Sequence, residues 1–288
     1  MQVTMLGDVA PRPRRVAVGE FDGVHLGHRE VIAGNDTVLT FEPHPLAVIR
    51  PQAAPKLLTS LDVKIELIAA LGVLELVVIP FDERFAAQSP REFIDQILIG
   101  KMGATHVSVG ENFRFGHGAA GDPEMLAADP RFATRVVELV EFDGEIVSSS
   151  HIRALVLAGD VDHANRFLGA PFQLRGEVVA GDRRGRTLGF PTANIVPDEK
   201  LVCPGHGVYA ARADGALAAV SVGVRPTFGT GRGVLVEAYL LDRDEDLYGR
   251  QLRIDFLARL RGERRFETVE GLVEQMRRDV AETRARAG

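Results

Sequence analysis

The first half of the chain alternates between short apolar runs and segments whose apolar residues recur every three or four positions. The short runs predict buried strands at 15–21, 37–41, 74–81, 104–110 and 135–142. The periodic segments predict helices at 61–71, 90–102, 149–158 and 161–168. Ser89 is suited to cap the second of these helices, which has Pro90 in its first turn. This alternation favours an α/β domain in which helices cover both faces of a parallel sheet.

The pattern changes near residues 167–171. Strand-like runs separated by glycine and proline then follow one another, at 174–181, 207–213, 217–223, 234–241 and 251–260. Such spacing favours an antiparallel barrel or sandwich. A last helix is predicted after Thr268, with apolar residues on one face at Val269, Leu272, Val273, Met276 and Val280. We therefore expect two domains, residues 1–167 and residues 168–288.

The charge and composition of the chain limit which partners and which cellular compartment we expect. The net charge is −6, and the chain has no long basic block, so nucleic acid and membrane surfaces are poor partners. The longest apolar stretch, 67–80, is interrupted by Glu75 and is shorter than the ~20 apolar residues that span a bilayer. The single cysteine, Cys203, permits no intramolecular disulfide, and the amino terminus lacks a secretory apolar core. We expect a cytoplasmic protein that is a monomer or a weak homo-oligomer.

The segment 19–28, GEFDGVHLGH, places two histidines in a glycine-containing turn between a strand and a helix. The start of a helix offers free backbone N–H groups to an anion, and Gly23 and Gly27 let the backbone approach closely. His25 and His28 can donate hydrogen bonds to phosphoryl oxygens. A metal site would need a third ligand, for which His44 is the nearby candidate, and a purely structural turn is the third interpretation. With no HExxH motif or cysteine cluster, the spacing favours phosphate.

Two further segments are compatible with an anion site. The run 148–153, SSSHIR, opens a helix with capping serines and puts Arg153 near the first turn, where the helix dipole disfavours a cation unless an anion lies between them. An arginine that points into solvent or pairs with a carboxylate is the simpler explanation for that run alone. The loop 110–122, GENFRFGHGAAGD, can close over a ligand or be an ordinary surface loop.

The second half has a separate candidate site. The stretch 181–194, GDRRGRTLGFPTAN, combines glycines and arginines as a triphosphate-binding loop can, although it is not a Walker A sequence and also fits a charged hairpin. Thr192 and Asn194 offer neutral oxygens of the kind that Mg²⁺ accepts. Glu237 lies in a predicted strand, on the face that also carries Leu235 and Tyr239. It is either a solvated residue on the outer face or a base in a pocket.

Several of these stretches, in this order, resemble one family. GxFDGxHxGH, TFEPHP, GENFRFG and SSSHIR are similar to the adenylyltransferase half of the bacterial bifunctional riboflavin kinase/FAD synthetase (FMN adenylyltransferase) family. LGFPTAN, SVGVRPTF and VEAYLLDRDEDLYG resemble its riboflavin kinase half. The resemblance implies a Rossmann-like nucleotidyltransferase domain followed by a six-stranded antiparallel β-barrel with a C-terminal helix. It also implies that ATP phosphorylates riboflavin to FMN, and that a second ATP adenylylates FMN to FAD with release of pyrophosphate.

The resemblance also assigns roles to residues. Carried over onto this chain, it makes His25, His28, Arg153 and Glu237 catalytic, with Glu237 the base for the riboflavin hydroxyl. It assigns Mg²⁺, bound with ATP, to Thr192 and Asn194. It implies nucleotide and flavin contacts for Gly19, Phe21, Asp22, Gly23, Gly27, His44, Asn112, Ser149, Ser150, Gly181, Gly185, Arg186, Gly189, Pro191, Thr192, Asn194 and Arg225.

One departure from the family leaves an alternative open. Eight residues separate His28 from Thr37, roughly a dozen fewer than family members usually have, so the first helix must be about two turns long. The alternative is a riboflavin kinase with a degenerate adenylyltransferase domain that acts as a flavin- or nucleotide-binding module. A flavin product analysis distinguishes the two.

Overall fold

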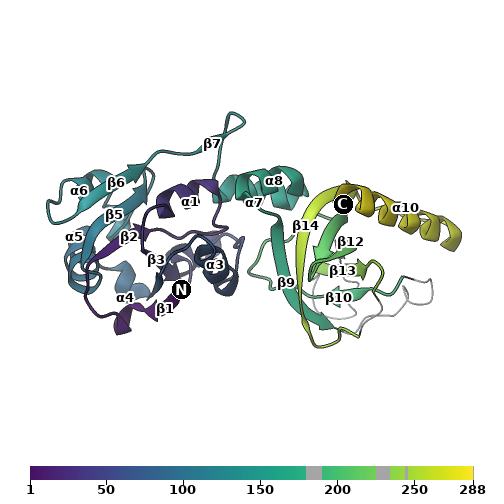
Figure 1. Cartoon of the computed structure of the whole chain (residues 1–288), viewed down its shortest axis with the longest axis horizontal. Helices are drawn as coiled ribbons and strands as arrows, with labels where there is room; N and C mark the ends of the chain where they lie inside the picture. Colours follow the sequence, from purple (N-terminus) through teal and green to yellow (C-terminus); the bar gives the residue numbers. More distant parts are fainter. Residues whose placement is uncertain (180–189, 225–233, 244–245, 288) are drawn as a thin grey trace. The chain divides into compact units, whose positions relative to one another are not determined.

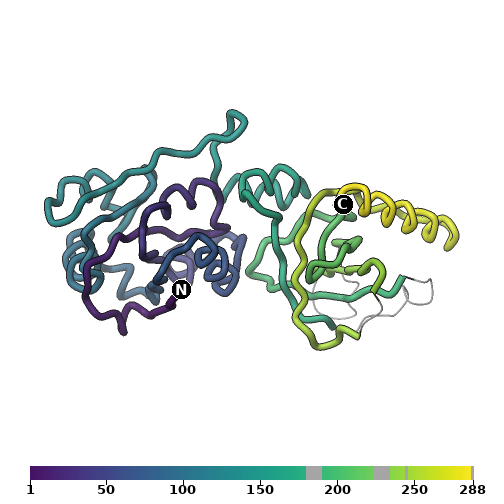
Figure 2. Tube along the Cα trace, in the orientation of Figure 1, coloured from purple at the N-terminus to yellow at the C-terminus, as the bar shows by residue number. Residues whose placement is uncertain are grey.

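The computed structural model describes residues 1–179, 190–224, 234–243 and 246–287. The chain divides into two compact units, Met1–Ser149 and Ser150–Gly288, drawn in Figure 1 and as a trace in Figure 2.

The first unit contains a six-stranded parallel sheet in the order β1-β4-β3-β2-β5-β6. Its strands are β1 (Gln2–Met5), β2 (Arg14–Val18), β3 (Thr37–Glu42), β4 (Glu75–Pro80), β5 (Ala104–Gly110) and β6 (Ala133–Val137). The predicted α/β architecture is confirmed. Strand β1 escaped prediction because its four residues are mostly exposed and show no apolar run.

The predicted strand 135–142 is wrong in extent. Strand β6 ends at Val137, and the chain then forms a small hairpin of β7 (Glu141–Phe142) and β8 (Glu145–Ile146). The turn between them has positive φ at Asp143 (54°) and Gly144 (80°), which ends the extended conformation.

Alternate residues of the buried strands enter two separate cores. Val16 and Val18 face one core together with η3 (Phe93–Lys101) and α6 (Pro123–Ala127), whereas Ala17 faces the other with α1 (Leu26–Ile32) and α3 (Leu61–Ala69). Helices therefore cover both faces of the sheet, as predicted. The remaining short helical segments of this unit are η1 (Leu6–Asp8), α2 (Pro45–Ile49), η2 (Pro51–Ala53), α4 (Glu83–Ala86), α5 (Pro90–Glu92) and η4 (His117–Ala119).

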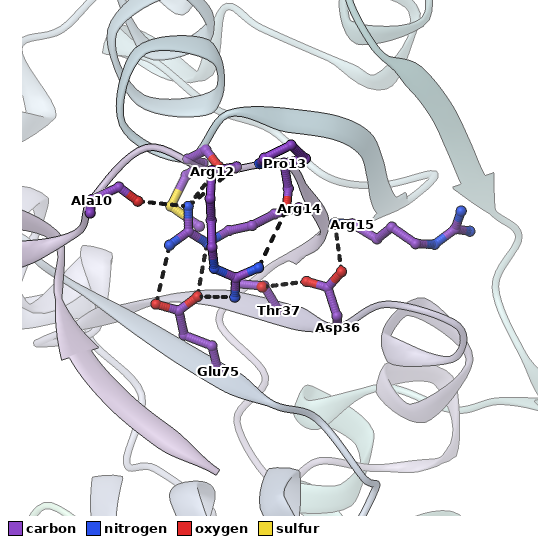
Figure 3. A network of polar contacts seen from close by, with 9 residues as sticks. Ala10, Arg12, Pro13, Arg14, Arg15, Asp36, Thr37 and Glu75 are labelled. Carbon is purple, nitrogen blue, oxygen red and sulfur yellow. Dashed lines mark hydrogen bonds and ion pairs between the residues drawn. The ribbon is translucent and has the colours of Figure 1, made fainter.

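A buried ion pair joins strands β2 and β4 where both begin (Figure 3). Arg14, 3% exposed, donates to Glu75 from Nε at 2.8 Å and from Nη2 at 3.3 Å, and Glu75 is 5% exposed. Arg12 adds a third contact at 2.7 Å from its more exposed guanidinium. The network ties the amino-terminal edge of the sheet together, at the opposite end of the strands from the loops described below.

The second unit contains helices α7 (Ser149–Ala158) and α8 (Val161–Leu168) and a closed barrel. The first residue of α7, Ser149, is the last residue of the first unit. The antiparallel strand order is β10-β13-β12-β11-β14-β9. The strands are β9 (Phe172–Val179), β10 (Ala193–Ile195), β11 (Gly207–Ala213), β12 (Ala216–Val224), β13 (Val234–Leu240) and β14 (Gln251–Arg261). The sequence pattern allowed a barrel or a sandwich, and the structure shows a barrel.

Both helices pack on the barrel. Asn165 of α8 donates to the carbonyl of Phe256 at 2.8 Å, and Arg259 of β14 donates to the carbonyl of Ala158 at 3.1 Å. The compact units therefore part near Ser149, and the boundary at residues 167–168 stays a prediction about where each activity resides. Helix α10 (Val269–Ala287) ends the chain, and the Thr268 hydroxyl accepts from Gly271 N–H at 3.1 Å, as a cap does.

Candidate active sites

Three of the motif-bearing loops leave adjacent strands at one edge of the parallel sheet. Strands β3, β2 and β5 are neighbours, and their carboxyl ends lead into FEPHP, GEFDGVHLGH and GENF. Ligands of open parallel sheets bind beyond the carboxyl ends of the strands. The fold therefore brings together segments that lie about 20 to 90 residues apart in the sequence.

The turn from β2 to α1 has an unusual backbone. Phe21, Gly23 and Val24 have φ values of 54°, 86° and 42°, in the left-handed region. Only Gly23 adopts this conformation without a steric cost. Phe21 and Val24 are 1% exposed, so packing keeps both side chains in place. The predicted strand 15–21 thus ends at Val18 and gives way to a tightly folded turn.

Asp22 holds this turn against a second segment of the chain. Its carboxylate accepts hydrogen bonds from the N–H groups of Leu58 at 2.9 Å and Thr59 at 3.1 Å. The Thr59 hydroxyl accepts from Gly23 N–H at 3.2 Å, and the Ser149 hydroxyl donates to the Asp22 carbonyl at 3.0 Å. Asp22 and Ser149 therefore shape the turn, and Asp22 itself is 2% exposed.

The two histidines lie together at the start of α1. His25 is the N-cap, and its Nδ1 accepts from His28 N–H at 3.3 Å. The two rings stack with centroids 3.5 Å apart and planes 18° apart, and Phe21 meets His28 edge-on at 5.4 Å. A Cβ on Gly27 would lie 3.3 Å from the His25 ring, a tight contact, so the absence of a side chain at Gly27 leaves room for this ring. Helix α1 has seven residues, which confirms the expected two turns.

His44 has a local role in the structure. It is the N-cap of α2, and its Nδ1 accepts from Leu46 N–H at 3.1 Å. Among the described residues, no group of three or more His, Cys, Asp or Glu side chains is arranged to hold a metal ion. His25 and His28 lie at the start of α1, a position that favours an anion.

A buried ion pair beside the turn was not predicted. Lys64 of α3, 2% exposed, donates to the Glu20 carbonyl at 2.7 Å and to Glu20 Oε1 at 3.1 Å. Burial raises the pKa of the Glu20 carboxyl to about 7, against the opposing effect of Lys64. The sequence held one signal: Lys64 falls on the apolar stripe of the helix 61–71, where a charge needs a buried partner.

The remaining residues predicted for the first site lie at three other places in the fold. Asn112 is exposed, just past the carboxyl end of β5, and its side chain lies close to Gly110. Gly19 follows β2 and donates its N–H to Leu39 of β3 at 3.1 Å. Arg153 lies on α7 in the second unit, where it donates to the Ser150 hydroxyl at 3.3 Å.

The second site is organised by strand register. Glu237 of β13 is paired with Asn194 of β10 on one side and with Ser221 of β12 on the other. Directly paired residues project to the same face, so the three side chains form one row across the barrel wall. Val236 and Ala238, both 0% exposed, point into the apolar interior. Glu237 therefore faces outward, where it is half-buried beside an Asn194 that is only 7% exposed.

The segment that leads into β10 packs near this row. Phe190 is buried and meets the Tyr239 ring at 5.1 Å, and Tyr239 shares the outward face of β13 with Glu237. Pro191 is exposed and Thr192 half-buried between Phe190 and the strand. The other residues predicted for this site lie outside the described residues: Gly181, Gly185, Arg186, Gly189 and Arg225.

Comparison with known proteins accounts for both halves. The FAD synthetase family matches residues 8–151, and the riboflavin kinase family matches residues 168–287. The chain belongs to the bifunctional riboflavin kinase/FMN adenylyltransferase family. A family member from Listeria monocytogenes is 39% identical, covering 94% of this chain and 91% of its own length. One from Escherichia coli strain K12 is 36% identical over 92% and 90% of the two chains.

This bifunctional enzyme phosphorylates riboflavin to FMN and adenylylates FMN to FAD, with riboflavin, FMN and ATP as its small-molecule substrates.

A solved structure from Streptococcus pneumoniae, named as a macrolide-efflux protein, is 30% identical and superimposes with a TM-score of 0.90 over 99% of both chains. Across the part of the chain that is described, no helix combines the length and the apolar character needed to cross a membrane.

Proposed function

We propose that FMN adenylylation occurs at the carboxyl edge of the parallel sheet, with His25 and His28 as its phosphate-contacting groups. The observation that carries this assignment is the stacked histidine pair at the start of α1, directly beyond strand β2. Free N–H groups and the positive end of the helix dipole favour an anion there. Asn112 and the segment around His44 leave the two neighbouring strands at the same edge.

The geometry supports a role for each histidine. Because His25 Nδ1 accepts the His28 N–H, a neutral His25 ring carries its proton on Nε2 and can donate it. In the reaction, a phosphate oxygen of FMN bonds to the α-phosphorus of ATP, and the bond from that phosphorus to the pyrophosphate oxygen breaks. Donors fixed beside the phosphates stabilise the negative charge that builds during this exchange. The phosphate roles that the family resemblance gives Ser150 and Arg153 of α7 stay predictions.

For riboflavin phosphorylation we propose Glu237 as the base. Its outward, half-buried place beside Asn194 suits a carboxylate that orients a ribityl hydroxyl and accepts its proton. Thr192 and Asn194 fit Mg²⁺, because they offer neutral oxygens next to one carboxylate, and this ion keeps most of its water. Bound with ATP, Mg²⁺ would neutralise charge on the phosphates. Gly181, Gly185, Arg186, Gly189, Pro191 and Arg225 complete the proposed nucleotide and flavin contacts.

A variant with one histidine removed tests the adenylylation site. His28→Ala should lower FAD formation from supplied FMN by ~10²–10³, the usual effect of losing one such donor. FMN formation from riboflavin should stay near normal because the barrel is untouched. Flavins separated by chromatography give both rates from the same preparation. An unchanged FAD rate removes His28 from the mechanism, and an equal loss of both activities indicates a folding defect.

The wild-type product pattern tests the alternative. A degenerate first domain would yield FMN alone from riboflavin and Mg-ATP, whereas the bifunctional enzyme yields FMN and FAD. The short α1 favours the alternative, and the complete turn, with its stacked histidines and buried Asp22, favours an active site. We further propose a cytoplasmic location, supported by the single cysteine and the use of ATP, and a monomer or weak homo-oligomer without nucleic-acid or membrane partners.

A further inference from the structure

Hydrogen bonds from residues 58–64 hold the turn that carries the histidines in its conformation. A left-handed backbone conformation is unfavourable for a residue other than glycine and persists only where its surroundings impose it. Phe21 and Val24 are two such residues. The N–H groups of Leu58 and Thr59 bind the Asp22 carboxylate between them, and the Thr59 hydroxyl binds Gly23 N–H. These contacts fix the middle of the turn.

Lys64 fixes the entry to the turn. Its ammonium and the Thr40 hydroxyl both donate to the Glu20 carbonyl, at 2.7 and 3.1 Å. This carbonyl belongs to the peptide that joins Glu20 to the left-handed Phe21, so two donors hold that peptide plane in one orientation. A second contact, from Lys64 Nζ to Glu20 Oε1 at 3.1 Å, closes a ring between the side chain and its own backbone. Lys64 is 2% exposed, which keeps the ammonium in place.

The charge of Glu20 responds to pH near neutrality. Its Oε2 is buried and has no hydrogen-bond partner among the described residues. Three charged groups face the carboxylate: Lys64 from α3, Asp22 from the turn itself and Glu42 from the end of β3. Burial, followed by the opposing effect of Lys64 and the smaller effects of Asp22 and Glu42, leaves the pKa of Glu20 at about 7. A modest fall in pH therefore removes the counter-charge of Lys64.

We propose that Lys64 and Glu20 are positioning residues for FMN adenylylation, which hold the turn bearing His25 and His28 and release part of that hold when Glu20 is neutral. The inference rests on the assignment of the two histidines above. A neutral Glu20 leaves a buried ammonium with only carbonyl partners, so the peptide before Phe21 is held less firmly. A misplacement of about 1 Å at a reacting group can lower a rate by ~10².

The first test removes the ammonium. Lys64→Met keeps the length of the side chain, and FAD formation from supplied FMN and Mg-ATP should fall at least ~10-fold, a part of the loss that misplacement can cause. FMN formation by the same full-length protein should not change. Lys101→Met, at an exposed lysine just before β5, is the matched control and should leave both rates unchanged. A FAD rate within about threefold of wild type overturns the proposal, because positioning effects are larger.

The second test measures how the FAD rate depends on pH, because a purely structural role of Glu20 would not change that dependence. The wild-type FAD rate should fall between pH 8 and pH 6, across the Glu20 pKa of about 7. Glu20→Gln imitates the neutral state, so its rate at pH 8 should be several-fold lower and its dependence on pH weaker than that of wild type. A wild-type profile in Glu20→Gln overturns the proposal even if Lys64→Met fails to fold. A normal FAD rate in His28→Ala would instead remove the site, whatever the Lys64 variants show.

Discussion

Neutralising Glu75 should destabilise the first unit without affecting its chemistry. In Glu75→Gln the Arg14 guanidinium loses its counter-charge although it is only 3% exposed. It cannot turn toward solvent easily, because Nη1 also donates to the carbonyl of Ala10 at 3.1 Å (Figure 3) and to that of Met102 at 2.9 Å. Breaking a buried pair by removing one partner costs ~3–5 kcal/mol, and the retained glutamine oxygen favours the lower end of that range.

Calorimetry of the full chain measures this effect. In a domain of roughly 150 residues each kcal/mol shifts the unfolding midpoint by ~2–4 °C, so a loss of about 3 kcal/mol lowers it by ~6–12 °C. Only the transition of the first unit should move. Glu83→Gln, at an exposed glutamate of α4, is the matched control and should stay within ~0.5 kcal/mol of wild type. FAD formation at 20 °C should remain normal because Glu75 begins its strand, at the edge opposite the proposed site.

The pH dependence gives a second check. Hydrogen bonds from Arg14 hold the pKa of Glu75 below its usual value of 4.5. A carboxyl whose pKa is depressed by folding contributes stability above its unfolded pKa and loses it as pH falls through the folded pKa. The difference between wild type and Glu75→Gln should therefore be full at pH 7 and shrink below about pH 4.5. A midpoint shift under about 2 °C at pH 7, or a difference that does not shrink in acid, would refute the reasoning.

Residues 168–288 should fold and convert riboflavin to FMN, but residues 150–288 should unfold at a higher temperature, because the longer fragment keeps Asn165 and the α7 carbonyl that binds Arg259. Equal midpoints for the two fragments would show that the helices add no stability to the barrel. Glu237→Gln should lower FMN formation by at least ~10² while supplied FMN is still converted to FAD. A kinase rate within about threefold of wild type would exclude Glu237 as the base, and a solvated outer-face residue would then be the correct description.

The sequence predicted the sheet and the loops at its carboxyl edge because both depend on local patterns. The segments 37–41 and 104–110 are rich in valine, threonine and other residues that favour strands, and the structure places strands within a residue of these two predictions, at Thr37–Glu42 and Ala104–Gly110. The pairing of Lys64 with Glu20 joins positions 44 residues apart and depends on how α3 packs beside the sheet. A charged residue on the apolar stripe of 61–71 indicated that some partner existed. It could not indicate which carboxylate.

In the second site, too, the sequence pattern predicts local features but not contacts between distant segments. Period-two alternation correctly separated Glu237 and Tyr239 from Val236 and Ala238. Alternation carries no information about register, however, and register is what places Asn194 and Ser221 on either side of Glu237. Nor does it give depth: Glu237 is half-buried on an outward face, beside a tyrosine that Phe190 partly covers. A carboxylate in that position is partly shielded from water and still open to a substrate hydroxyl, which is the combination that a base for riboflavin needs.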